Sequence, residues 1–138
     1  MSPFSLFLRH LRGARGLKQS ELARLLNYEG SYLSALERSQ KGPPNTDFLT
    51  RLVRCLELND EEQLALDEAV AMSKRQFSIP PQASEAEYRL INHLVSRLGS
   101  LNPVQIQLIE LAIASIPNSV DSYCSAKQPT DHKGGRAM

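Results

Sequence analysis

The side chains of this chain that could do chemistry gather within residues 19–41. They are one amide, two hydroxyls, one carboxylate and two cations. Groups of these types form hydrogen bonds and ion pairs, so the chemistry they suit is binding to a polar or charged surface. The set consists of Gln19, Glu29, Ser31, Ser34, Arg38 and Lys41.

Patterns typical of catalysis or metal binding are absent from the sequence. His10, His93 and His132 are scattered, and neither Cys55 nor Cys124 has a close partner cysteine. The sequence also lacks a glycine-rich phosphate loop, a zinc-protease motif and a serine nucleophile elbow. We therefore expect no enzyme activity, no metal and no cofactor, and we interpret both cysteines as reduced thiols.

Two short helices joined by a tight turn would position the polar set. Apolar residues recur at helical spacing on both sides of the turn Asn27-Tyr28-Glu29-Gly30-Ser31, which is too brief for a linker. Two helices joined in this way pack at a steep angle. The apolar positions are Leu22, Ala23, Leu25 and Leu26 before the turn, and Leu33 and Leu36 after it.

This pattern resembles the helix-turn-helix of the phage repressor and Cro-type (XRE) family of transcription regulators. Gln19-Ser20-Glu21-Leu22-Ala23 resembles the family's Gln-x-Glu-Leu-Ala opening, and residues 31–38 resemble its Ser-x-Ile-Ser-x-Ile-Glu-Arg signature. The resemblance covers about residues 4–58. It implies an all-α fold, with a five-helix repressor-like DNA-binding domain over residues 1–78, and double-stranded DNA as the partner.

The resemblance also implies roles for individual residues. The helix expected over Glu29–Arg38 would enter the major groove, and the pair Arg12 and Glu37 would tie the first helix to it. Base edges would be read by Glu29, Gly30, Ser31, Ser34 and Ala35. DNA phosphates would be bound by Gln19, Tyr32, Arg38 and Lys41.

The sequence departs from the family pattern at two glycine positions and among the base readers. Asn27 and Ser39 stand where relatives usually carry glycine, and asparagine is the better substitute for a left-handed backbone. Gly30 and Ala35 stand where many relatives have long polar readers. With such short side chains, we expect part of the discrimination to come from DNA shape.

Charge is distributed unevenly along the chain. Residues 1–58 hold nine Lys or Arg and five Asp or Glu, a net charge of +4, whereas residues 59–83 carry −3. The positive charge thus coincides with the helix-turn-helix, as binding to phosphates requires.

A second helical region follows a stiff linker at residues 79–83, which contains Pro80-Pro81. Residues 84–116 predict a helical hairpin whose last helix is apolar over roughly 200°, twice what one covered face needs. Within the hairpin, we expect the last helix to meet the first through Leu108, Ile109, Ala112 and Ile116, packed against Ile91, Leu94 and Leu98. We expect the remaining surface to pair with a second copy. Packing on the preceding helices is the alternative. The dimerisation set is Ile91, Leu94, Leu98, Ile106, Leu108, Leu111 and Ile113.

No apolar run reaches membrane-spanning length and no signal peptide precedes the first helix, so we expect a cytoplasmic protein with no membrane partner. Residues 117–138 are polar, with few apolar residues, and predict disorder.

Two hypotheses for the function follow from these patterns. The first is a sequence-specific transcription regulator, a repressor that binds a palindromic operator as a homodimer. The second is an antitoxin or adaptor of the same fold, whose main partner is another protein, such as a toxin or effector, bound by the apolar C-terminal surface.

Overall fold

The computed structural model describes residues 1–114, which form seven helices and no strand. The expected all-α class is therefore confirmed for this part of the chain. The chain divides into two compact units, one spanning Met1–Ser78 and the other beginning at Ile79. The expectations for the tail at 117–138, and those involving Ile116, Cys124 and His132, concern residues outside the described range.

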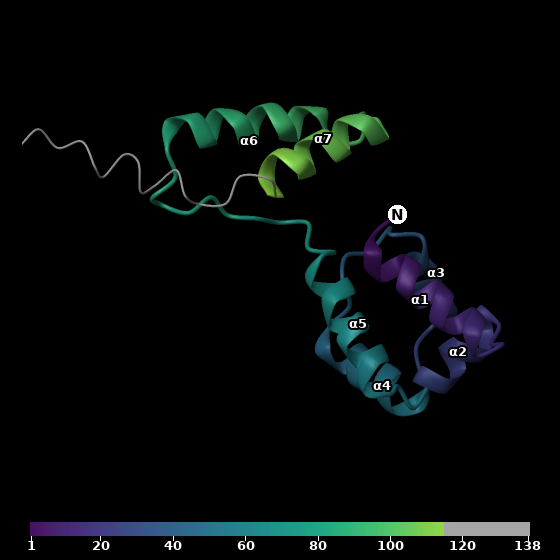
Figure 1. Cartoon of the computed structure of the whole chain (residues 1–138). Coiled ribbons are helices and arrows are strands. Elements are labelled where there is room, and N and C mark those ends of the chain that lie inside the picture. Colours follow the sequence, from purple (N-terminus) through teal and green to yellow (C-terminus); the bar gives the residue numbers. More distant parts are fainter. Residues whose placement is uncertain (115–138) are drawn as a thin grey trace, which may run out of the picture. The chain divides into compact units, whose positions relative to one another are not determined.

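The first unit contains five short helices that run in different directions (Figure 1). The second and third of them, joined by a three-residue turn, are the helix-turn-helix pair. The helices are α1 (Pro3–Ala14), α2 (Gln19–Leu26), α3 (Gly30–Glu37), α4 (Thr46–Cys55) and α5 (Asp60–Ala71).

Capping residues fix where these helices begin. Ser2 accepts a hydrogen bond from the Ser5 N–H at the start of α1, where Pro3 occupies the first helical position. Asn45 accepts from the Phe48 N–H at 3.0 Å and starts α4. Asn59 and Glu62 form a capping box at the start of α5.

A single core lies between the five helices. Leu8, Leu22, Leu33 and Phe48 are fully inaccessible to solvent, and each belongs to a different helix. The core is closed from the α5 side by Leu66 and by Ser73, whose hydroxyl accepts a hydrogen bond from the Phe4 N–H at 2.8 Å. The start of α1 is thereby fixed to the chain that follows α5.

The second unit contains α6 (Glu85–Arg97) and α7 (Pro103–Ala114), connected by a short loop. Ser84 with Glu87 caps α6, and Asn102 exchanges hydrogen bonds with Gln105 at the start of α7. The two predicted helices are therefore present. None of their residues is buried.

The packing expected inside this hairpin is wrong. Leu98 and Leu108, which were expected to meet across it, are 62% and 60% exposed, and Leu94 and Ile109 are only half-buried. The physical reason is that the two helices diverge from their connecting loop and leave a groove between them instead of a closed contact.

Candidate nucleic-acid interface

Helix α3 is held by its inner face and leaves its outer face free. Leu33 and Leu36 are fully buried, whereas Glu29, Gly30 and Ser31 at its N-terminal end are exposed. Ser34 and Ala35 are half-buried. The helix spans Gly30–Glu37, with Glu29 and Arg38 as flanking caps, so it is one residue shorter at each end than expected.

The turn before α3 depends on a left-handed backbone at Asn27. This residue has φ 55° and ψ 45° and ends α2, and the Tyr28 N–H donates to the Ala23 carbonyl at 3.0 Å. Asparagine tolerates this conformation better than other non-glycine residues. The substitution of glycine by Asn27 therefore leaves the geometry of the turn intact.

Ser39, after α3, is also left-handed, with φ 58°. Its hydroxyl accepts a hydrogen bond from the Ser2 N–H and donates to Ser5 Oγ, both at 2.8 Å. Ser5 in turn donates to the Leu36 carbonyl at 2.6 Å. Serine at this position thus connects the end of α3 to the start of α1, a role that glycine could not fill.

A buried carboxylate ties α3 to the two helices before it. Glu37 is 3% exposed and accepts from Arg12 Nε at 2.7 Å and from Gln19 Nε2 at 2.7 Å. Arg12 Nη1 also donates to the Leu17 carbonyl at 2.9 Å, in the loop between α1 and α2. The charge is therefore paired, and it fixes the angle at which α3 is presented.

An aromatic cluster flanks the outer side of α3. The Tyr28 and Tyr32 rings stack with centroids 5.2 Å apart, and both pack edge-on against the buried Phe48. Lys41 Nζ lies 5.0 Å above the Tyr32 ring, and the Arg51 guanidinium lies 5.1 Å above the Tyr28 ring. Two cations are thus held on rigid rings at the surface.

The tyrosine hydroxyls of this cluster stay protonated at neutral pH. A hydrogen bond donated to Asp47 raises the pKa of Tyr28 above its usual value of 10.0, and burial raises the pKa of Tyr32. Both side chains can therefore act as neutral hydrogen-bond donors.

The structure brings some of the expected phosphate-binding residues together and separates others. Tyr32 and Lys41 are in contact, and Arg38 is exposed, with its Nε donating to the Ser34 carbonyl at 3.3 Å. Gln19 instead directs its amide nitrogen at Glu37. In the free protein this residue therefore also orients α3, in addition to the role predicted for it.

Sequence reasoning missed Arg51, Asp47 and Tyr28 as parts of this surface. Arg51 and Asp47 form an ion pair at 3.2 Å with i,i+4 spacing, a signal that could have been read from the sequence. The contact of Tyr28 with Asp47 joins residues 19 positions apart. No local pattern indicates such a contact.

The fold and this surface define a helix-turn-helix module: two short helices across a tight turn, with the second helix exposed on its outer face. Residues 3–66 match a family model described as a helix-turn-helix domain. The match supports a DNA-binding transcription regulator, a class that is typically not enzymatic. No curated protein and no solved structure matches this chain.

Within residues 1–114, no group of three His, Cys, Asp or Glu side chains is placed to hold a metal ion. Among the described helices, none has the length and apolar character needed to cross a membrane. Cys55 is a free, exposed thiol.

Proposed function

We propose that this chain is a sequence-specific transcriptional repressor that binds a palindromic operator as a homodimer, as the Cro-type resemblance implies. The observation that carries the proposal is the presentation of α3. Its inner face is fixed by Leu33, Leu36 and the buried Glu37, while its N-terminal end is open to solvent. A rigid helix exposed in this way fits the major groove of DNA.

In the proposed complex, the N-terminal half of α3 faces the base edges. Glu29 can accept from a cytosine amino group, Ser31 and Ser34 can bond to several bases, and Ala35 can touch a thymine methyl group. Gly30 has open space around its Cβ position, so the backbone can come close to the DNA. Because these groups are short, DNA shape supplies part of the specificity.

In the proposed complex, the DNA phosphates on either side of the major groove are contacted from both ends of the helix-turn-helix. Arg38 and Lys41 supply positive charge just after α3, with Lys41 positioned by the Tyr32 ring. Gln19 lies at the start of α2, where its second amide hydrogen and free backbone N–H groups can reach a phosphate oxygen.

Selection of bound DNA from random sequence, at one stated salt concentration, tests the proposal. We expect enrichment of two inverted half-sites about one helical turn, roughly 34 Å, apart. A pool that stays random after several rounds, with protein that is folded, would contradict sequence-specific binding.

The base readers can be tested in the same selection. Ser31→Ala and Ser34→Ala should change the preferred bases, with a lost contact costing roughly 1–3 kcal/mol at one position. Ser96→Ala, a similar change in α6, is the matched control and should leave the preference unaltered. An unchanged preference in both α3 variants would move the readout to Glu29 or to DNA shape.

A second function is favoured by one observation, the exposed apolar surface of α6 and α7. In an antitoxin or adaptor of this fold, that surface would bind a toxin or effector protein. Sizing of the purified chain separates the two functions, since a clean dimer favours the repressor and a monomer that aggregates favours the adaptor.

A further inference from the structure

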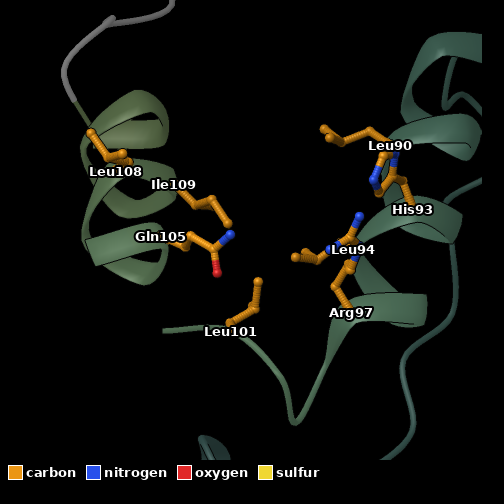
Figure 2. Close-up of a pocket in the computed structure, with 8 residues that line it drawn as sticks. All are labelled: Leu90, His93, Leu94, Arg97, Leu101, Gln105, Leu108 and Ile109. Atoms are coloured by element: carbon orange, nitrogen blue, oxygen red, sulfur yellow. The ribbon is translucent and has the colours of Figure 1, made fainter. Parts of the chain in front are cut away.

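A groove lined mainly by apolar side chains lies between α6 and α7, outside the helix-turn-helix module. Its volume is about 450 Å³, and side chains from both helices point into it (Figure 2). Its apolar walls are Leu90, Leu94, Leu101, Leu108 and Ile109. His93 and Arg97 line it from α6 and Gln105 from α7.

The hairpin of α6 and α7 leaves a large apolar surface exposed, because its two helices do not cover each other. Ten large apolar side chains between Tyr88 and Ile113, on α6, α7 and the loop that connects them, are between 39% and 76% exposed. At about 60–120 Å² for each side chain, this amounts to roughly 600–1,200 Å² of apolar area. A stable interface buries about 800 Å² on each partner, including its polar rim. The hairpin therefore carries about the area that one stable partner covers.

The same surface is needed to keep the helices formed. α6 has 13 residues and α7 has 12, and isolated helices of this length are marginal in water. Because no residue of either helix is buried within the chain's own hairpin, cover must come from elsewhere.

We propose that the cover is a second copy of the chain, with α7 of each copy inserted into the α6–α7 groove of the other. The hairpin has both parts of such a contact. The groove is the notch, and α7 is the ridge, because its apolar arc extends past the groove to Ile106 and Ile113 on one edge. A notch and a ridge on one surface are complementary to themselves about a two-fold axis.

Charge indicates which edge of α7 enters the groove. Glu110 lies four positions after Ile106 and three before Ile113, so the carboxylate borders this edge of the helix. The facing groove wall carries the cationic side chain of Arg97. Inserting the Ile106–Ile113 edge therefore brings a negative charge to a positive wall in both halves of the dimer.

Mass measurement of the full chain by sedimentation, over a range of concentrations, tests the proposal. The unaltered chain should be a dimer. Ile113→Glu on the ridge and Leu94→Glu in the groove should each raise the dimer dissociation constant by about 100-fold or more, because each buries an unpaired charge. Gln107→Glu adds the same residue to the polar side of α7 and should leave the dimer intact.

A charge-exchange experiment distinguishes the proposed interface from non-specific hydrophobic association. Arg97→Glu and Glu110→Arg should each weaken the dimer, and the double variant should restore it, because every subunit then carries both changes. Hydrogen exchange followed by mass spectrometry, which reports on separate segments, should show that residues 1–78 of each variant remain protected, so a failure to fold is recognised directly.

Four results would overturn the proposal. They are a monomeric full chain, a chain truncated after Ser78 that still dimerises, an Ile113→Glu variant that stays a dimer, and a charge exchange without rescue. A monomer would mean that residues 115–138, the preceding helices or a different molecule covers the groove. Failure here is distinct from failure of the proposed DNA binding, since a monomer would still prefer the same half-site, only more weakly.

Discussion

Residues 1–78 and residues 84–114 both form short helices that carry apolar side chains. Only the first region buries these side chains in a core of its own. Both use short amphipathic helices that start at Ser or Asn caps. In the first region Leu22, Leu33 and Phe48 are fully inaccessible, whereas in the second Leu111 and Ile113 are 61% and 76% exposed. An apolar pattern therefore shows that a face needs cover, and only the structure shows whether the chain itself provides it.

The polar contacts of the two regions differ in the same way. The Arg12–Glu37 pair is 23% and 3% exposed and joins two helices, while the Arg89–Glu85 pair is 77% and 88% exposed and stays within α6. The first region uses charge to fix the position of α3. The second uses it only on its surface.

The largest expected effects come from removing apolar side chains. Leu36→Ala should lower the free energy of unfolding of residues 1–78 by about 3–4 kcal/mol, because this leucine is fully buried. Leu111→Ala should leave that value unchanged and weaken only self-association. Hydrogen exchange followed by mass spectrometry reports the two regions separately. Equal losses in the first region would show that the two regions are not independent.

Breaking each of the two ion pairs should also change the free energy of unfolding by very different amounts. Arg12→Ala strands the buried Glu37 carboxylate, with Gln19 as its remaining side-chain donor, and should cost about 3 kcal/mol of unfolding free energy. Arg89→Ala, the matched change in the exposed pair, should cost less than about 0.5 kcal/mol. Denaturant unfolding at neutral pH measures both. A small cost for Arg12→Ala would mean that packing alone positions α3.

The smallest expected effect is a pH dependence at the start of α5. A hydrogen bond from Arg15 lowers the pKa of Glu62 below its usual 4.5. The lowered pKa means that this contact stabilises the fold above pH 4.5 and that the contribution disappears as the pH falls through the lower, folded-state value.

Glu62→Gln keeps the shape of the capping box and removes the charge. It should lower the Tm slightly at neutral pH and leave it unchanged in strong acid, where Glu62 is protonated in the unaltered chain too. Thermal unfolding of both proteins across this pH range measures the difference. A Tm difference that persists in strong acid would assign the effect to helix capping instead.

Much of the first region could be predicted because its signals are local. The caps at Ser2, Asn45 and Asn59, and the helical spacing of Leu33 and Leu36, locate the helices to within a residue or two. These patterns report the chemistry of a single turn of backbone, so tertiary contacts did not alter them.

The rest depends on contacts between distant residues. The hydrogen bonds of Ser39 with Ser2 and Ser5 span more than 30 positions, so a serine that looked like a defect in the sequence is a link in the structure. Gln19, which the sequence predicts to bind a phosphate, donates a hydrogen bond to Glu37 in the structure. The open angle between α6 and α7 has no sequence signal, because their apolar arcs fit a closed hairpin equally well.

The measurement that tests the central claim most directly is the salt dependence of DNA binding by the full chain. Arg38→Ala and Lys41→Ala should each weaken binding to all sequences alike and reduce the slope of log affinity against log salt by about 0.9, because each removes one phosphate contact. Arg89→Ala, a cation lost from α6, should leave the slope unchanged. If the two variants after α3 keep both the affinity and the slope of the unaltered chain, DNA does not bind at this face.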